Sequence, residues 1–291
     1  MSQTITEAFI QQFNRNVYML NQQIGSRIRG NLREETVHAK KAFFDRLAPT
    51  SVVEKVSRHD DTPLIEQIHS LRAVGMKDWG TADLVDREDK IRLLINPESE
   101  CARNFAMAMG RQMDIRIIAA FTADAEEGQF GGTFVPFPAA NTIPSGGTGL
   151  TVAKVREVKR RFDSNETPDD GRVFIISAQA LEDLLSTVEV TSFDFNRVKA
   201  LVQGQMPGDT WLGFKWIRVA DALLPIDGSL DRSCYAYQRD GMGLAIGADM
   251  TTMMDRRPDK WNALQILLTA SFDAVRVDDD RVLRVLVRET A

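Results

Sequence analysis

The sequence predicts an α+β fold in which one long helix and a compact α/β segment are flanked by strands. Three observations predict it. A helical pattern runs from residue 96 to about residue 121, strand and helix patterns alternate between residues 150 and 219, and strand patterns fill the last third of the chain. The chain has 291 residues, 43% of them hydrophobic, which is ample material for the core of one large domain or two smaller ones.

The chain opens with the pattern of an amphipathic helix. Its apolar residues recur at steps of three and four, which places them on one helical stripe: Ile5, Phe9, Phe13, Val17, Leu20, Ile24 and Ile28. Thr4 and Glu7 have the spacing of a capping box. The neighbouring sequence offers little apolar surface to cover the stripe. We therefore expect this arm to dock on a distant part of the chain or on another subunit.

Residues 33 to about 89 have the pattern of a long hairpin. A polar stretch, 59–63, separates two flanks that carry scattered apolar residues: Val37, Phe43, Phe44, Val52, Val53 and Val56 before it, and Leu71, Val74, Met76 and Trp79 after it. This density of large apolar residues is too low for an independent core. We expect an extension that packs against something else.

The longest regular element is the helix that begins at Asn96-Pro97. Asparagine is a favoured N-cap, and proline at the first helical position gives up an N–H group that would have no partner there. A helix over residues 97–121 would span about 38 Å at 1.5 Å per residue. Its apolar side chains are mostly small or flexible, which suits a rod packed closely against a sheet.

The segments after this helix alternate between loop, helix and strand. The predicted elements are a Gly- and Pro-rich loop (128–149), a helix (152–162), a buried strand (173–176), a helix capped by Ser177, a further helix (194–203) and a strand (211–219). Two hairpins are predicted to follow: strands 234–239 and 242–246 around Asp240-Gly241, and strands 270–277 and 282–287 around the turn 278–280. The middle of the chain is therefore expected to be a compact α/β unit.

We find no motif of catalysis or of cofactor binding. The three histidines, His38, His59 and His69, have no metal-ligand spacing, and no GxSxG elbow supplies a nucleophilic serine. The glycine-rich segment 145–151 precedes a helix, but it lacks the GK[ST] ending of a phosphate-binding loop, so a flexible connecting loop is the better interpretation. We expect no enzyme activity, no cofactor and no metal ion.

The charge and the cysteine content further limit the class of protein to which the chain can belong. The formal net charge of −5 argues against a classical DNA-reading protein. Residues 15–46 are locally basic, with seven basic residues against three acidic ones, and a solvated face explains this more simply than a phosphate-binding arm. Cys101 and Cys234 are expected to be buried free thiols. We recognise no secretory signal and no membrane-spanning apolar run, so synthesis in the cytoplasm is expected.

Eight short segments carry a family likeness. They are FIQQF (9–13), QQIGSRIRG (22–30), KKAFFDR (40–46), SRH (57–59), DTP (61–63), ADLVD (82–86), DK (89–90) and AMGRQMD (108–114). Together with the order of arm, hairpin, rod helix, α/β unit and closing strands, they resemble the major capsid proteins of tailed bacteriophages, whose fold is shared with encapsulins and the herpesvirus capsid floor. The resemblance is strongest over residues 1–125. Beyond residue 125, only the arrangement of the elements supports it.

The resemblance implies the tailed-phage major capsid fold and a place in it for each part. These parts are an N-terminal arm (1–32), an extended loop (33–80), a peripheral domain (81–130 and 240–291) that contains the spine helix (97–121), and an axial domain (131–239). Many copies, as hexamers and pentamers, would form the icosahedral head shell of the virion around double-stranded DNA, contacted without sequence specificity. Scaffolding, portal and decoration proteins are further partners that such a shell can have; no membrane is involved. Synthesis would take place in the host bacterial cytoplasm.

On this interpretation the working parts are interfaces between subunits. The residues expected there are Phe9, Phe13, Val17, Arg27, Arg29, Phe43, Phe44, Arg58 and Trp79. Two alternatives stay open: an encapsulin-like nanocompartment shell that holds protein cargo, and an α/β enzyme of unknown reaction between residues 150 and 219. Particles that lack nucleic acid but retain a cargo enzyme would favour the nanocompartment. A small soluble oligomer with a ligand-filled pocket would favour the enzyme.

Overall fold

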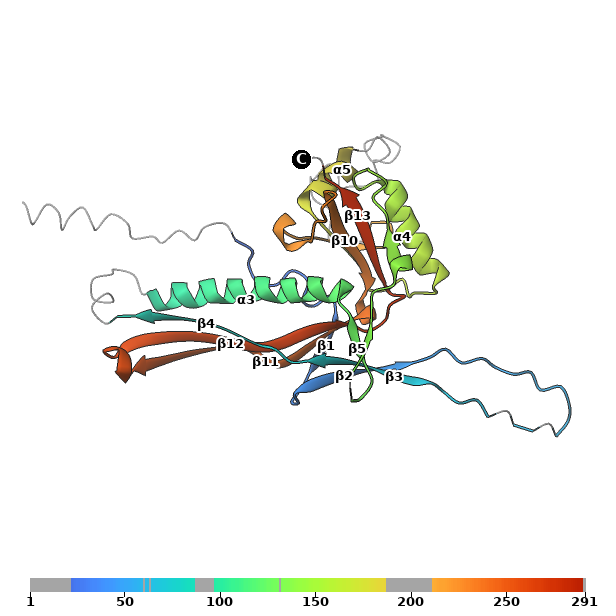
Figure 1. The fold of residues 1–291 in the computed structure, drawn as a ribbon, viewed down its shortest axis with the longest axis horizontal. Coiled ribbons are helices and arrows are strands. Elements are labelled where there is room, and N and C mark those ends of the chain that lie inside the picture. Colours follow the sequence, from blue (N-terminus) through green and yellow to red (C-terminus); the bar gives the residue numbers. More distant parts are fainter. Residues whose placement is uncertain are drawn as a thin grey trace, which may run out of the picture.

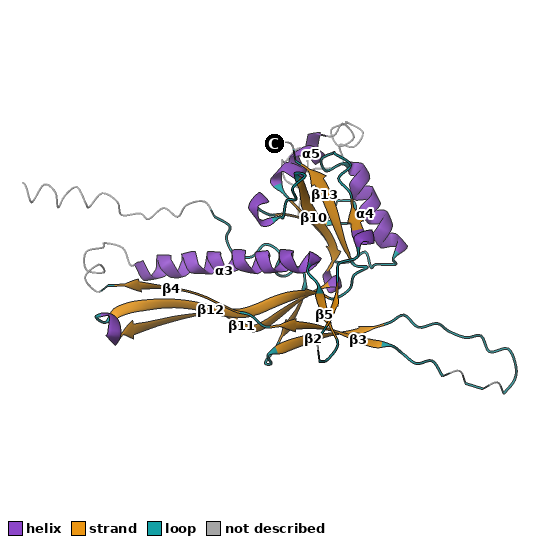
Figure 2. Cartoon of the chain, in the orientation of Figure 1, coloured by secondary structure: helices purple, strands orange, loops and turns teal. Residues whose placement is uncertain are grey.

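The computed structural model of the chain describes residues 22–59, 61–62, 64–86, 97–130, 132–186 and 211–289. The strands among these residues form three sheets, and one long helix, α3 (Pro97–Thr122), lies along the longest of them (Figures 1 and 2). The long sheet and α3 extend to one side, a hairpin loop extends to the opposite side, and an α/β unit stands on the junction between them (Figure 1). Among the described helices, none has an apolar stretch sufficient to cross a membrane.

The long sheet has the strand order β1–β11–β12–β4. Its strands are β1 (Arg33–Thr36), β11 (Met242–Arg257), β12 (Ala263–Arg276) and β4 (Asp78–Val85). The 26 residues of α3 span roughly 39 Å and lie along one face of this sheet. Buried residues recur every four positions along the helix: Met109, Met113, Ile117 and Phe121. They share one core with alternate residues of β12: Leu268, Ala270 and Phe272. The predicted rod against a sheet is confirmed.

The α/β unit contains a five-stranded sheet of order β7–β13–β10–β8–β9. Its strands are β7 (Thr142–Ile143), β13 (Val282–Arg288), β10 (Asp231–Gln238), β8 (Arg172–Ile176) and β9 (Lys215–Arg218), and its helices are α4 (Val152–Ser164) and α5 (Ala178–Ser186). The predicted cap is confirmed, because the Ser177 hydroxyl accepts a hydrogen bond from the N–H of Ala180 at 3.0 Å. At the end of α3, the ring of Phe121 stacks on Tyr235 at 4.7 Å, so the cores of the helix and of the α/β unit are continuous.

The third sheet carries the hairpin extension. It has the order β2–β3–β5–β6 and consists of β2 (Lys41–Leu47), β3 (His69–Gly75), β5 (Ala125–Glu127) and β6 (Thr133–Val135). β2 and β3 are antiparallel from Lys41 opposite Gly75 to Leu47 opposite His69, which confirms the predicted hairpin. The strands that flank it in the sequence, β1 and β4, pair in the long sheet instead.

Both hairpins predicted in the last third of the chain are wrong. β10 and β11 follow each other around Asp240-Gly241, yet they lie in different sheets, and so do β12 and β13. β11 pairs with β12 across the turn 258–262, and β10 pairs with β13. Strand length explains these pairings, because each strand pairs with one of similar length. β11 and β12 have 16 and 14 residues, whereas β10 and β13 have 8 and 7. A turn signal predicts a change of direction, but it does not identify the pairing partner.

The predicted N-terminal helix is wrong at its C-terminal end. Residues 22–30 form bends and turns, where Ile24 is exposed and Ile28 is fully buried, although both were assigned to one stripe. Gly25 and Gly30 have φ angles of +70° and +86°, which end an α-helix. The remaining N-terminal residues of that prediction, the helix 194–203 and the cap at Asn96 lie outside the described residues.

The two cysteines differ in environment. Cys234 in β10 is buried, and burial raises the pKa of its thiol to about 12. Cys101 in α3 is only half-buried, which corrects the expectation that both thiols are buried. Both are free thiols. At neutral pH the Cys234 thiol is protonated and therefore unreactive as a nucleophile.

One buried arginine joins the long sheet to its neighbours. Arg276 ends β12, is fully buried, and donates to three main-chain carbonyl oxygens at 2.9 to 3.1 Å: those of Phe121, Ala123 and Val135. Its guanidinium also contacts the carboxylate of Asp279, which accepts a second hydrogen bond from Arg72 of β3 at 2.8 Å. The end of α3, the long sheet and the hairpin sheet are thus held at one charged group.

Candidate assembly surfaces

The loop between β2 and β3 presents apolar side chains to solvent. The last paired rung among the described residues is the hydrogen bond from the N–H of Ala48 to the carbonyl of Ile68, at 3.1 Å. Beyond this rung, large apolar side chains are exposed by 44 to 98%: Val52, Val53, Leu64 and Ile65. Figure 1 shows the loop reaching away from every other element. A concentration of exposed apolar groups of this kind marks a contact surface.

At the base of the hairpin, two adjacent phenylalanines face opposite ways. Phe44 is fully buried against the long sheet, where its ring occupies the space that a side chain on Gly243 would need. Phe43 is 38% exposed on the other face. A side chain without exposed surface has no area to offer a neighbour. Phe44 is therefore part of the chain's own core, which corrects its assignment to a subunit interface, whereas Phe43 stays a candidate.

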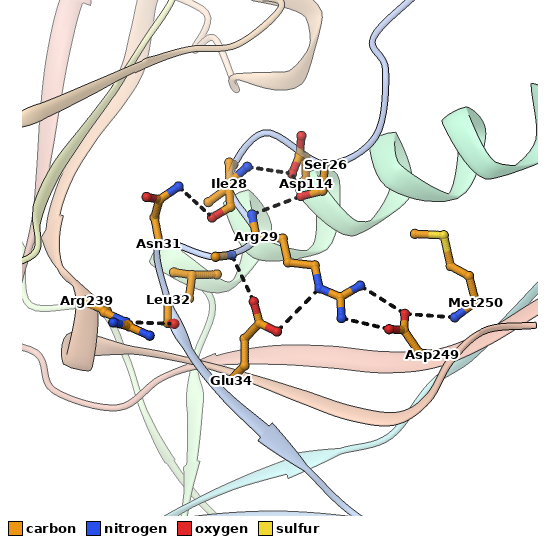
Figure 3. Close-up of polar contacts among 11 residues, drawn as sticks. Ser26, Ile28, Arg29, Asn31, Leu32, Glu34, Asp114, Arg239, Asp249 and Met250 are labelled. Carbon is orange, nitrogen blue, oxygen red and sulfur yellow. Dashed lines mark hydrogen bonds and ion pairs between the residues drawn. The ribbon is translucent and has the colours of Figure 1, made fainter. Parts of the chain in front are cut away.

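Residues 22–32, which we call the arm root, are clamped to α3 by one carboxylate. Asp114 is fully buried in α3 and accepts hydrogen bonds from the side chains of Gln23 and Ser26 and from the N–H groups of Arg27 and Ile28, the last two at 3.0 and 3.3 Å. Figure 3 shows Asp114 beside Ser26 and Ile28. No cation approaches this carboxylate among these contacts. Four donors from one short segment replace the water that the charge would otherwise bind.

Further contacts tie the arm root to the other parts of the molecule. The guanidinium of Arg29 donates two hydrogen bonds to Asp249 of β11, both at 3.0 Å, and forms an ion pair with Glu34 (Figure 3). These contacts lower the pKa of Asp249. Arg27 donates to the carbonyl of Arg218 in β9 at 2.7 Å. Arg27 and Arg29, predicted as interface residues, are therefore used within the chain.

The arm root packs so closely on α3 that one helical position has no room for a side chain. A Cβ atom on Gly110 would lie 2.4 Å from the carbonyl carbon of Gly25. Gly110 and Asp114 lie in the segment AMGRQMD (108–114), but neither was predicted to be a contact residue. Both belong to a second four-residue repeat on α3, with Ile118, beside the apolar stripe, and that repeat is the signal that could have located the arm-root contact.

Replacing Gly110 with alanine is expected to release the arm root. Alanine favours a helix by about 1 kcal/mol, but the clash is with main chain that cannot yield without moving. Trypsin should cleave after Arg27 and Arg29 about tenfold faster than in the natural chain, which corresponds to roughly 1.4 kcal/mol. Gly75→Ala is the matched control, because nothing lies within 4 Å of a Cβ there. Equal cleavage of the two variants would contradict the tight packing.

Two further predicted interface residues have contrasting positions. Trp79 in β4 lies half-buried under α3, where its indole N–H donates to the carbonyl of Phe272 at 3.3 Å and the Arg116 guanidinium lies 5.9 Å from its ring. Its contacts are thus within the chain. Arg58 is exposed in the loop between β2 and β3 and remains a candidate. Phe9, Phe13 and Val17 lie outside the described residues.

The glycine-rich loop before α4 is hydrogen-bonded to the α/β unit near its C-terminal end. Its Ser145 is buried and donates to Asp231 at 2.7 Å. The ammonium group of Lys154 donates to the carbonyls of Thr148 and Gly149, both at 2.8 Å, so carbonyl oxygens of the loop surround this cation. Among the described residues, no group of three or more His, Cys, Asp and Glu side chains is placed to hold a metal ion.

Comparison with known proteins places the chain in a family. The phage capsid protein family matches residues 5–289. No curated protein matches the chain. The fold is similar to the capsid structure of cyanophage P-SCSP1u (12% identity, TM-score 0.72, 99% of this chain and 95% of that one), to the capsid of Ralstonia phage GP4 (8%, 0.69, 96% and 96%) and to a structure of Microbacterium phage Oxtober96 (13%, 0.68, 98% and 98%).

These similarities extend over the long sheet, α3, the hairpin and the α/β unit together, because nearly the whole of each chain is covered. The predicted resemblance to tailed-phage major capsid proteins is confirmed. The chain belongs to the phage capsid protein family, has the tailed-phage capsid fold, and is a structural major capsid protein.

Proposed function

We propose that many copies of this chain, arranged as hexamers and pentamers, close into the icosahedral head shell that encloses double-stranded DNA in the virion. One observation carries the proposal beyond the family assignment. The loop between β2 and β3 projects from the subunit with its apolar side chains uncovered. Neighbouring copies are the surfaces that a shell places against such a loop.

The division into arm (1–32), extended loop (33–80), peripheral domain (81–130 and 240–291) and axial domain (131–239) remains our proposal, with two changes. β1 and β4 are grouped with the peripheral part, since both pair in the long sheet. β13 is grouped with the axial part, since it pairs with β10. With these changes the long sheet lies within the peripheral part and the five-stranded sheet within the axial part, while the hairpin sheet joins β2 and β3 of the extended loop to β5 and β6.

The shell is proposed to contact DNA without sequence specificity and to need no catalytic residue or cofactor. A net charge of −5 for each subunit keeps such contacts weak. Scaffolding, portal and decoration proteins are proposed as separate partners, and synthesis is proposed to take place in the host bacterial cytoplasm. An encapsulin-like compartment is the second candidate, which nucleic acid inside purified particles would contradict.

Electron microscopy of the purified chain, expressed alone and with its neighbouring phage genes, tests the proposal. Closed angular particles of uniform size are expected. A variant in which two glycines replace residues 52–65 should keep the far-UV circular dichroism of the natural subunit and form no closed particles. A uniformly small oligomer of the natural chain under both conditions would contradict the shell, and normal particles from the loop variant would contradict the role of the loop.

A further inference from the structure

The turn that joins β11 to β12, at the far end of the long sheet, carries an exposed tryptophan. Trp261 is 97% exposed, so its indole has almost no contact within the chain. Its φ of +51° and the φ of +58° at Asn262 place both residues in the left-handed region. That region favours glycine and asparagine and is unfavourable for bulky side chains. The fold alone gives no reason for a tryptophan here, which points to a contact outside the chain.

A groove lies beside this turn, on the face of the sheet that is opposite α3. Its volume is about 280 Å³, and its lining consists of Ala82, Asp83, Leu84, Arg257, Lys260 and Gln265. Leu84 and Gln265 are paired across β4 and β12, so their side chains share a face. The neighbour of Gln265 along β12, Ile266, is fully buried and points to the other face. Figure 1 shows no helix over the groove side of this sheet.

The chemistry of the groove fits an indole ring. Arg257 donates to both oxygens of Asp259 at 2.9 Å and, through its remaining terminal nitrogen, to the side-chain oxygen of Gln265 at 2.9 Å. All three nitrogens are occupied in the plane of the guanidinium, so a face of the group is left for stacking on an aromatic ring. Leu84, 44% exposed, and Ala82 add apolar surface beside it.

We propose that Trp261 of one copy binds in the groove formed by Ala82, Leu84, Arg257, Lys260 and Gln265 of a second copy. The proposal rests on the assembly of many copies proposed above. Trp261 and the groove lie at the same end of the molecule, so the contact joins two copies end to end. Each copy can both supply a tryptophan and bind one. Because Trp261 is 97% exposed, it does not fill the groove of its own chain.

Acrylamide quenching of tryptophan fluorescence tests this contact directly. The signal of Trp261 is obtained by subtracting the spectrum of Trp261→Phe from that of the natural chain, in unassembled subunits and in assembled particles. We expect acrylamide to quench this signal in subunits and to leave it largely unquenched in particles. Leu84→Glu, which places a charge in the groove, should reduce particle yield and make Trp261 accessible again in whatever particles form.

Particle yield supplies the matched control. Trp261→Ala should lower the yield of closed particles about tenfold, as expected for an aromatic anchor of an interface. Phe130→Ala removes an equally exposed aromatic side chain, 92% exposed, from the turn after β5, and should leave the yield near that of the natural chain. Both residues are exposed, so neither substitution disturbs the core.

Failure of this contact and failure of the shell are distinguishable. Closed particles in which Trp261 stays open to acrylamide would overturn the contact and leave the shell intact. Small oligomers that protect Trp261 without closing would support the contact and contradict the shell. A protected Trp261 that is unaffected by Leu84→Glu would overturn the groove as its binding site, and a chain that stays monomeric would overturn both proposals.

Discussion

Replacing Arg276 with methionine is expected to lower the free energy of unfolding by about 3 to 5 kcal/mol, the range found when one partner of a buried ion pair is removed. Methionine keeps much of the volume and supplies no donor. Asp279 then loses one of its two arginine partners, and three main-chain carbonyls at the end of α3 and in β6 lose theirs. Chemical denaturation of the unassembled subunit, followed by circular dichroism, measures the loss.

Arg256→Met is the matched control for this measurement. Arg256 lies in β11 and is exposed, and its side chain has no hydrogen-bond or ion-pair partner among the described residues. It should change the free energy of unfolding by less than about 0.5 kcal/mol, as is usual for surface substitutions. Equal stability of the two variants would mean that Arg276 does not hold the junction.

Asp114→Asn is expected to cost about 2 to 3 kcal/mol and to detach the arm root. The amide is nearly isosteric with the carboxylate, but it replaces one acceptor oxygen by an NH₂ group that faces donors. Each carboxylate oxygen accepts two of the four hydrogen bonds, so two donors of residues 23–28 are then left facing the NH₂ group. Hydrogen exchange separates detachment from general unfolding, because the amides of Arg27 and Ile28 should lose protection while those of β10 keep it.

The control for Asp114 is Asp124→Asn, on an exposed carboxyl just after α3 that has no partner among the described residues. This variant should exchange like the natural chain at Arg27 and Ile28. Unchanged protection of these two amides in Asp114→Asn would show that the carboxylate does not hold the arm root. Equal loss across the whole molecule would show a global effect instead.

Elements governed by local pattern were predictable, and strand pairing was not. The helix 97–121, the helix of residues 152–162 and the hairpin of β2 and β3 depend on periodicity and on caps within a short window. The partner of β10 lies about fifty residues away, and β11 pairs with the next strand, β12, rather than with β10; the turn signal at Asp240-Gly241 has no information on either pairing.

For the candidate surfaces too, features set by local sequence were predictable, and features set by distant parts of the chain were not. Apolar content predicted an extended loop, yet it did not separate exposed Phe43 from buried Phe44, which a pleated strand turns to opposite faces. Arg27 and Arg29 were identified by charge alone, and their partners, such as Asp249, lie far along the chain. Arg276, Asp114 and Trp261 were missed because the role of each depends on what the fold brings beside it.

Among the described residues, the ladder between β2 and β3 ends at Ala48 and Ile68, and this has a kinetic consequence for the proposed shell. An extended loop without paired rungs loses conformational entropy when a neighbour fixes it, roughly 1 to 2 kcal/mol for each residue. A single contact between two subunits offsets little of that cost, whereas a closing ring offers several contacts at once. In the proposed shell, the loop is therefore expected to act as a nucleation barrier: isolated pairs of subunits would dissociate, and growth would become favourable only once a nucleus of several subunits has formed.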